Sequence, residues 1–103
     1  MRVVFFLNTL HEHVNPQDYE EWVRTVDYPT ARGIPSIVEY TVSRAEGLLE
    51  GDEPAPYDYI ERVVISDLDA YRRDLAAPEL EDFGRQWSSY VKTSIAVVGT
   101  VIE

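Results

Sequence analysis

The segment from Arg2 to Leu10 restricts the fold of this chain more than any other, because it is apolar at successive positions. In a β-strand, Val3 and Phe5 would lie on one face and Val4 and Phe6 on the other. A strand with one face in water alternates apolar and polar residues instead. The sequence therefore predicts a sheet that is covered on both faces.

The other elements follow from the spacing of apolar residues and from the positions of proline and glycine. In chain order, the pattern predicts a strand at 2–10, a helix at 16–26, strands at 36–44 and 57–65, a helix that continues to about 92, and a strand at 94–102. Ser66 or Asp67 is expected to cap the second helix. Pro78 is expected to interrupt the second helix, as a kink or a new start. The order βαββαβ predicts an α+β, ferredoxin-like fold, with a four-stranded antiparallel sheet and two helices on one face.

Residues 1–103 are expected to form a single domain, in which two helices can cover only one face of the sheet. The last strand is apolar on both faces as well, since Val97 and Val101 alternate with Ala96 and Val98. The uncovered face is expected to pack against the same face of a second copy. The sequence thus predicts a homodimer.

The first predicted helix carries one apolar stripe at spacing i, i+3, i+4 and i+7, formed by Tyr19, Trp22, Val23 and Val26. Asn15 before Pro16 is typical of a helix start. Pro29 disfavours helical dihedral angles at Tyr28, so the helix is expected to end near Asp27.

The composition excludes several classes of partner. The chain has 19 acidic and 9 basic residues and a formal net charge of −10, which argues against nucleic acids and anionic membrane surfaces. No segment is long and apolar enough to span a membrane or to act as a signal peptide, so a cytoplasmic protein is expected. There is no cysteine and no glycine-rich phosphate or dinucleotide motif, so no cofactor is expected. Any chemistry would then proceed by proton transfer, orientation and exclusion of water.

Candidate acid–base residues occur in three places. His11 and His13 follow the first strand and suit proton transfer at neutral pH, although both could instead be solvated loop residues, and no metal site is expected from them. Asp27 could shuttle protons if its pKa is raised near apolar side chains, or it could cap the following turn. Glu39 and Glu61 lie in adjacent predicted strands and could meet on one face, or Glu39 could pair with an arginine in solvent.

We expect His13, Asp27 and Glu61 to be catalytic, in an aromatic-lined pocket between the sheet and the helices. Asn8 interrupts an apolar strand and could orient a ligand or bond across the sheet. The side chains expected to contact the substrate are Asn8, His11, Trp22, Tyr28, Glu39, Tyr59 and Trp87.

Several short motifs together resemble the RedY-like (HapK) family: Tyr19-Glu20-x-Trp22, Asp27-Tyr28-Pro29-Thr30, Pro35-Ser36-Ile37 and Tyr57-Asp58-Tyr59-Ile60-Glu61. The resemblance covers nearly the whole chain and implies a dimeric α/β barrel linked to prodiginine-type and bisindole pathways. It implies a small aromatic substrate that upstream pathway enzymes supply. EthD-like relatives carry histidine where this chain has Asp27, and Ala77-Pro78-Glu79-Leu80 lacks the histidine of polyketide-cyclase relatives, so no helix-two histidine can be carried over.

The hypothesis that follows is a cofactor-independent cyclase acting on a reactive indole- or pyrrole-derived intermediate. One alternative is a non-catalytic protein that binds and sequesters such a compound. Another is a cofactor-free monooxygenase on the same scaffold, which would need an activated substrate carbanion and would consume oxygen.

Overall fold

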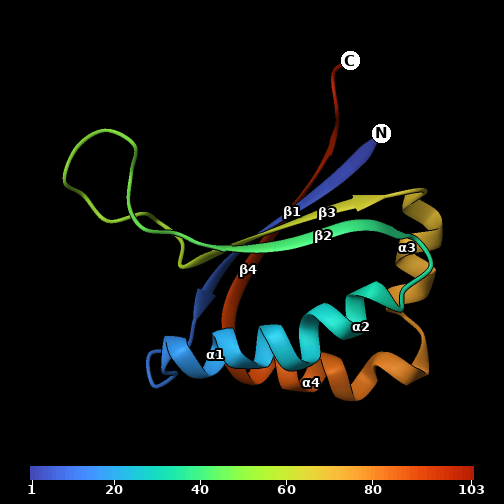
Figure 1. Ribbon diagram of the computed structural model, residues 1–103, viewed down its shortest axis with the longest axis horizontal. Coiled ribbons are helices and arrows are strands. Elements are labelled where there is room, and N and C mark those ends of the chain that lie inside the picture. The colour runs from blue at the N-terminus through green and yellow to red at the C-terminus, as the bar shows by residue number, and fades with distance from the viewer.

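The computed structural model describes all of residues 1–103, as a four-stranded antiparallel sheet with its helices on one face (Figure 1). The strands are β1 (Arg2–Leu10), β2 (Ile37–Arg44), β3 (Tyr59–Ile65) and β4 (Val91–Thr100), in the spatial order β2-β3-β1-β4. The helical segments are α1 (Pro16–Trp22), the π-helical turn η1 (Val23–Asp27), α2 (Tyr28–Arg32), α3 (Leu68–Leu75), the 3₁₀ turn η2 (Pro78–Leu80) and α4 (Glu81–Tyr90). The predicted ferredoxin-like α+β fold is confirmed.

The first helix starts as predicted but does not end where predicted. The Asn15 side chain accepts a hydrogen bond of 2.9 Å from the backbone N–H of Gln17, which caps α1. Tyr28 then remains helical, with φ −58° and ψ −49°, and α2 continues to Arg32. The prediction that Pro29 ends the helix is therefore wrong.

The helix passes Pro29 because a wider π-helical turn precedes it. The N–H of Tyr28 donates to the carbonyl of Val23, five residues earlier. Pro29 then lies in the first turn of α2, where a missing N–H costs no hydrogen bond. Turns of this kind often occur at functional sites.

The π-helical turn also decides which side chains face the sheet. Tyr19, Val23, Asp27 and Ala31 recur every four residues, and all four are buried. In a regular α-helix each step of four residues would turn the side chain about 40° further round the axis. The wider turn reduces this rotation, so Asp27 stays on the same side as Tyr19 and Val23. It therefore points into the protein rather than capping the next turn.

The second predicted helix is divided at Pro78, as a new start. The Asp67 side chain caps α3 by accepting 2.8 Å from the N–H of Ala70. The chain re-enters a helix at η2 and continues as α4. Helix α4 ends at Tyr90 rather than Lys92, because Val91 already pairs with Leu10 at the start of β4. None of the helices combines the length and hydropathy needed to cross a membrane.

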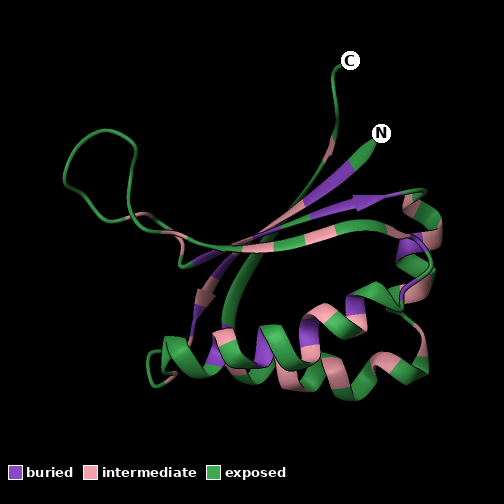
Figure 2. Cartoon of the chain, in the orientation of Figure 1, coloured by how far each residue is buried: buried purple, intermediate pink, exposed green.

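Apolar side chains lie on both faces of the sheet. The register pairs Phe5 with Val97 and Phe6 with Ala96, so Phe5 and Phe6 point to opposite faces. Strand β4 is exposed along most of its length, whereas β3 is largely buried (Figure 2). On the face away from the helices, Ile95 and Val97 are 51% and 48% exposed.

Candidate active site

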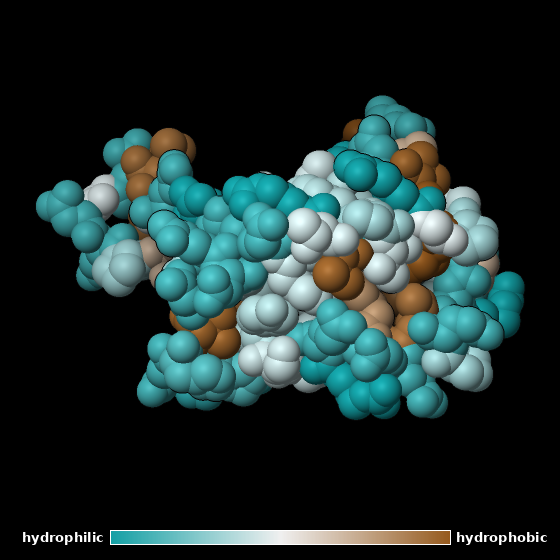
Figure 3. Space-filling view, turned by 60° about the horizontal axis from the view of Figure 1, so that its bottom comes forward, coloured by the Kyte–Doolittle hydropathy of each residue, from teal (hydrophilic) through white to brown (hydrophobic).

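A cavity of about 190 Å³ lies between the helix-facing side of the sheet and the helices. Its walls are mainly apolar and aromatic, and they include Phe6, Ile34, Ile37, Tyr71, Leu80, Phe83 and Trp87. Figure 3 shows the molecule with its helical side turned forward, and a group of apolar side chains is visible there among hydrophilic ones. The only carboxyl groups in the wall are those of Asp27 and Glu61. We therefore take this cavity as the candidate active site.

Tyr40 joins these two carboxyl groups. The hydroxyl of Tyr40, on β2, lies 2.7 Å from Oδ2 of Asp27 and also makes a hydrogen bond to Oε1 of Glu61. Asp27 is 1% exposed and Glu61 is 5% exposed. The π-helical turn supplies Asp27, β3 supplies Glu61 and β2 supplies Tyr40, so three separate elements meet at this phenol.

This arrangement sets the smallest number of protons that the pair must hold. A tyrosine hydroxyl has one hydrogen, so it can donate to only one of the two carboxyl groups. The other carboxyl must carry a proton and donate it to the phenol oxygen. Asp27 and Glu61 therefore hold at least one proton between them, and their titrations are coupled.

Two further side chains support Glu61 from the neighbouring strands. The amide of Asn8, on β1, donates to Oε2 of Glu61. The hydroxyl of Ser94, on β4, donates 2.6 Å to Oδ1 of Asn8. A row of hydrogen bonds thus runs from Ser94 through Asn8, Glu61 and Tyr40 to Asp27, with one residue from each strand. Asn8 bonds across the sheet in this structure, and it is fully buried behind the cavity wall.

The surroundings raise the pKa values of both carboxyl groups. Burial raises the pKa of Asp27 to about 7, with the hydrogen bond from Tyr40 acting against it and the charge of Glu61 adding to it. Burial also raises the pKa of Glu61, against hydrogen bonds from Tyr40, Asn8 and Trp87. A group with a pKa near neutrality can both accept and donate a proton under physiological conditions.

Glu39 does not meet Glu61; of the two alternatives for Glu39, the ion pair with an arginine is the one that forms. The pairing of β2 with β3 shifts register between Ile37 and Glu39, which turns these two residues to opposite faces. Ile37 lines the cavity, while Glu39 is exposed and forms an ion pair of 3.1 Å with Arg62. The partner of Glu61 is Asp27 instead.

The two histidines lie away from the cavity, at the end of β1. Their rings stack with centroids 5.5 Å apart, and Nε2 of His11 lies 3.0 Å from the backbone oxygen of Ser88. Neither His11 nor His13 forms part of the cavity wall. The structure therefore does not bring His13 together with Asp27 and Glu61.

Of the aromatic residues predicted to contact substrate, only Trp87 lines the cavity. Trp22 is buried in a core with Tyr19 and Tyr59, and its indole N–H donates 2.8 Å to Gln86. The hydroxyl of Tyr59 donates 2.6 Å to Glu20.

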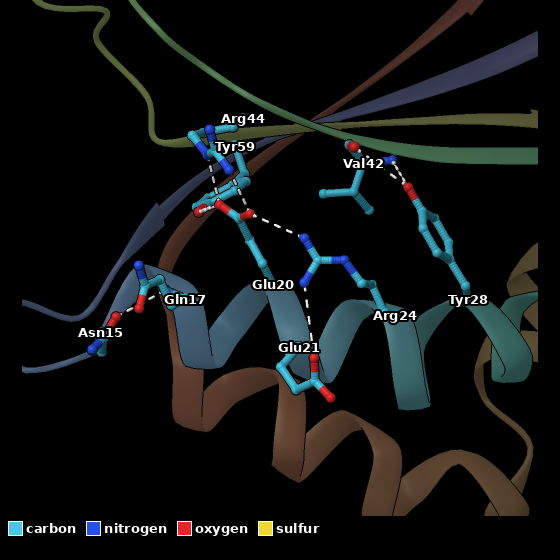
Figure 4. Close-up of polar contacts among 9 residues, drawn as sticks. All are labelled: Asn15, Gln17, Glu20, Glu21, Arg24, Tyr28, Val42, Arg44 and Tyr59. Atoms are coloured by element: carbon cyan, nitrogen blue, oxygen red, sulfur yellow. Dashed lines mark hydrogen bonds and ion pairs between the residues drawn. The ribbon is translucent and has the colours of Figure 1, made fainter.

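Tyr28 and Tyr59 border a second, polar pocket on the other side of the helix, around Glu20 (Figure 4). The Tyr28 hydroxyl accepts a 3.0 Å hydrogen bond from the N–H of Val42. The hydrogen bond from Arg44 lowers the pKa of Glu20 to about 2, helped by the one from Tyr59. Glu20 is therefore a permanent carboxylate near neutral pH and does not suit proton exchange.

Tyr40 is the residue of the candidate site that the sequence patterns did not single out. The sequence does contain an indication of its position, because Tyr40 and Val42 lie two residues apart and so share the face that points towards the helices. In the observed register Val42 lies opposite Glu61, so Tyr40 is its diagonal neighbour. That neighbour relation becomes visible only once the two strands are aligned.

Comparisons with known proteins agree with the fold. The structure superposes on HapK from Hahella chejuensis with a TM-score of 0.83 and 26% identity, covering 99% of this chain and 93% of that one. It superposes on SnoaB, a cofactor-independent oxygenase from Streptomyces nogalater, with a TM-score of 0.72 and 25% identity, covering 99% and 94%. A dimeric ferredoxin-like protein of unknown function from Thermobifida fusca shares 18% identity and a TM-score of 0.72, covering 97% and 90%, and shows the fold alone.

No curated protein sequence matches the chain. The profile of the family described as REDY-like protein HapK matches residues 2–102, which is nearly the entire sequence. The chain therefore belongs to the REDY-like protein HapK family.

Proposed function

We propose that this protein is a cofactor-independent enzyme that catalyses proton transfer during cyclisation of a reactive indole- or pyrrole-derived intermediate in natural-product biosynthesis. The observation that carries the proposal is the buried pair of Asp27 and Glu61, which the Tyr40 hydroxyl joins by hydrogen bonds in the wall of an apolar cavity. Membership of the REDY-like family supports the proposal.

The proposed reaction uses the pair as acid and base together. An electron-rich ring carbon attacks an electrophilic carbon of the same substrate and forms the new C–C bond. The protonated carboxyl gives its proton to the heteroatom that gains electrons, and the ionised carboxylate takes the proton that leaves the ring carbon. The substrate is isomerised without gain or loss of atoms, and the pair again holds one proton.

The apolar wall has two roles in this proposal. Phe83 and Trp87 offer flat surfaces on which a planar ring can stack. The wall also keeps water from the intermediate, which limits competing hydrolysis and strengthens electrostatic interactions with the carboxyl pair. Upstream pathway enzymes would supply the reactive substrate.

The experiment that tests the proposal is product analysis in vitro. An upstream bisindole or bipyrrole intermediate is generated enzymatically, divided, and incubated with or without this protein, and the products are separated and identified by mass. We expect a cyclised isomer to dominate only with the protein present. Identical product ratios in the two samples would reject catalysis. Saturable binding without any change in products would indicate the sequestering protein instead.

A second candidate is a cofactor-free monooxygenase, which the 25% identity to SnoaB over 99% of this chain favours. There the ionised carboxylate would remove a proton from the substrate, and the resulting carbanion would react with molecular oxygen. An oxygen electrode separates the two functions. Cyclisation proceeds at the same rate without oxygen, whereas oxygenation consumes one molecule of oxygen per turnover.

We also propose that the functional form is a homodimer, with the helix-free faces of two sheets packed together as a dimeric α/β barrel. The exposed apolar side chains of Ile95 and Val97 on that face support this arrangement. The dimeric protein from Thermobifida fusca has the same fold.

Light scattering coupled to gel filtration tests the dimer. We expect the mass of two chains for the wild type at micromolar concentration and of one chain for Val97→Asp, because burying an unpaired carboxylate at an interface is costly. Leu49→Asp is the matched control, since Leu49 is 98% exposed in the loop between β2 and β3. A wild type that elutes with the mass of one chain would contradict the proposal.

A further inference from the structure

The cavity at the carboxyl pair is small for the ligands that its walls suggest. Its volume of about 190 Å³ is little more than that of an engineered cavity that holds benzene, about 150 Å³. Pockets that enclose whole drug-sized molecules are usually larger, roughly 300–1,000 Å³. One ring, or two fused rings, therefore fills the enclosed space.

The cavity has a closed end and an open end. Asp27, Glu61 and Tyr71 are buried, so they mark its floor. Leu75, at the end of α3, is 42% exposed, and Gly84, on α4, is exposed as well. The cavity thus opens to solvent on the side of these two residues, and the carboxyl pair is away from solvent.

Gly84 has no structural reason to be a glycine. It lies in the interior of α4, where glycine lowers helix stability relative to alanine. Its φ is not positive, so the backbone does not require glycine there. A Cβ added at this position would meet no atom within 4 Å, so no neighbouring element approaches too closely for a side chain. What the missing side chain does is leave the mouth of the cavity open.

We infer that the substrate is an elongated molecule with a single mono- or bicyclic aromatic head, and that Gly84 is the residue that lets the rest of it leave the cavity. The head lies on the floor, with a ring N–H directed at the ionised carboxylate of the pair. The remainder passes over the backbone of Gly84 into solvent. This inference rests on the proposed use of the cavity as the aromatic-substrate site.

Two probe ligands test the inference. Indole represents the head alone, and 5-phenylindole carries an additional ring at the end far from its N–H. Isothermal titration calorimetry is used to compare the wild type with Gly84→Leu. The wild type is expected to bind both compounds. In Gly84→Leu the affinity for 5-phenylindole is expected to fall by about tenfold or more, because the leucine side chain occupies the opening through which the second ring would leave the cavity. The affinity for indole is expected to change by less than about twofold.

Two variants control for folding and for added bulk. Gly84→Ala should raise the thermal midpoint, because the helix gains a better helix former without a clash. Arg85→Leu adds a leucine at the next exposed position of α4, outside the cavity wall, and should change neither affinity. Equal weakening of both ligands in Gly84→Leu, or no weakening of either, would overturn the role of Gly84 and leave the proposed site intact. A wild type that binds neither compound would overturn both.

Discussion

Replacing Asp27 by asparagine is expected to lower the rate of product formation by about 100- to 10,000-fold, the usual contribution of a general acid or base. The asparagine side chain has nearly the same shape and can still bond to Tyr40. It can neither take up nor release the shared proton. The measurement is the initial rate of cyclised product under saturating substrate, followed by chromatography.

The matched control for this variant is Glu39→Gln, which makes the same change of a carboxylate to an amide at an exposed position of β2. Its rate should stay within about twofold of the wild type, since surface ion pairs contribute little. Substrate affinity should be retained in Asp27→Asn, which distinguishes lost chemistry from lost binding. A full rate in this variant would exclude Asp27 from the proton-transfer step.

The stability of the protein is expected to fall as the pH rises through about 7, because of the same residue. The pKa of Asp27 is raised from 3.8 to about 7 in the folded protein, so the folded state holds its proton more tightly than the unfolded state. The contribution of this proton to the free energy of unfolding is complete below pH 3.8 and is lost as the pH rises through the folded pKa of about 7. At about 1.4 kcal/mol per unit, the loss amounts to about 4 kcal/mol between these limits.

The free energy of unfolding, from urea titrations at a series of pH values between 4 and 8, measures this effect. Other groups also titrate, so the informative quantity is the difference between the wild type and Asp27→Asn at each pH. The free energy of unfolding of the variant should increase relative to that of the wild type as pH rises, because the buried amide needs no proton to stay neutral. A difference that is constant across this range would mean that Asp27 is ionised in the folded protein throughout.

Local features of the structure could be predicted from the sequence. The helix caps at Asn15 and Asp67 depend only on residues within the next turn, and both form as the sequence indicates. The alternation of β1 correctly assigns Phe5 and Phe6 to opposite faces. The burial of Glu61 follows from its place among apolar strand residues.

Features that depend on irregular backbone could not be predicted. The π-helical turn before Pro29 has no sequence signature, and it turns Asp27 from a helix terminator into an inward-facing acid. The pairing of β2 with β3 places Val42 opposite Glu61 and Thr41 opposite Arg62. Glu39 shares a face with Thr41 and so points away from Glu61, and the correct pair of acids was not recognised. Tyr40 escaped notice for the same reason, since its position next to Glu61 follows from pairing between strands.

The row of hydrogen bonds from Ser94 to Asp27 has a consequence for incompletely assembled molecules. A slip of β4 by two residues would keep its apolar side chains on the same faces but would place Ala96 beside Asn8. The amide of Asn8 would then lose the hydroxyl that holds it, and with it the orientation of its donor towards Glu61. Under the proposed function, a chain with misaligned β4 is therefore expected to be inactive, and only molecules with a correctly aligned sheet would convert the substrate.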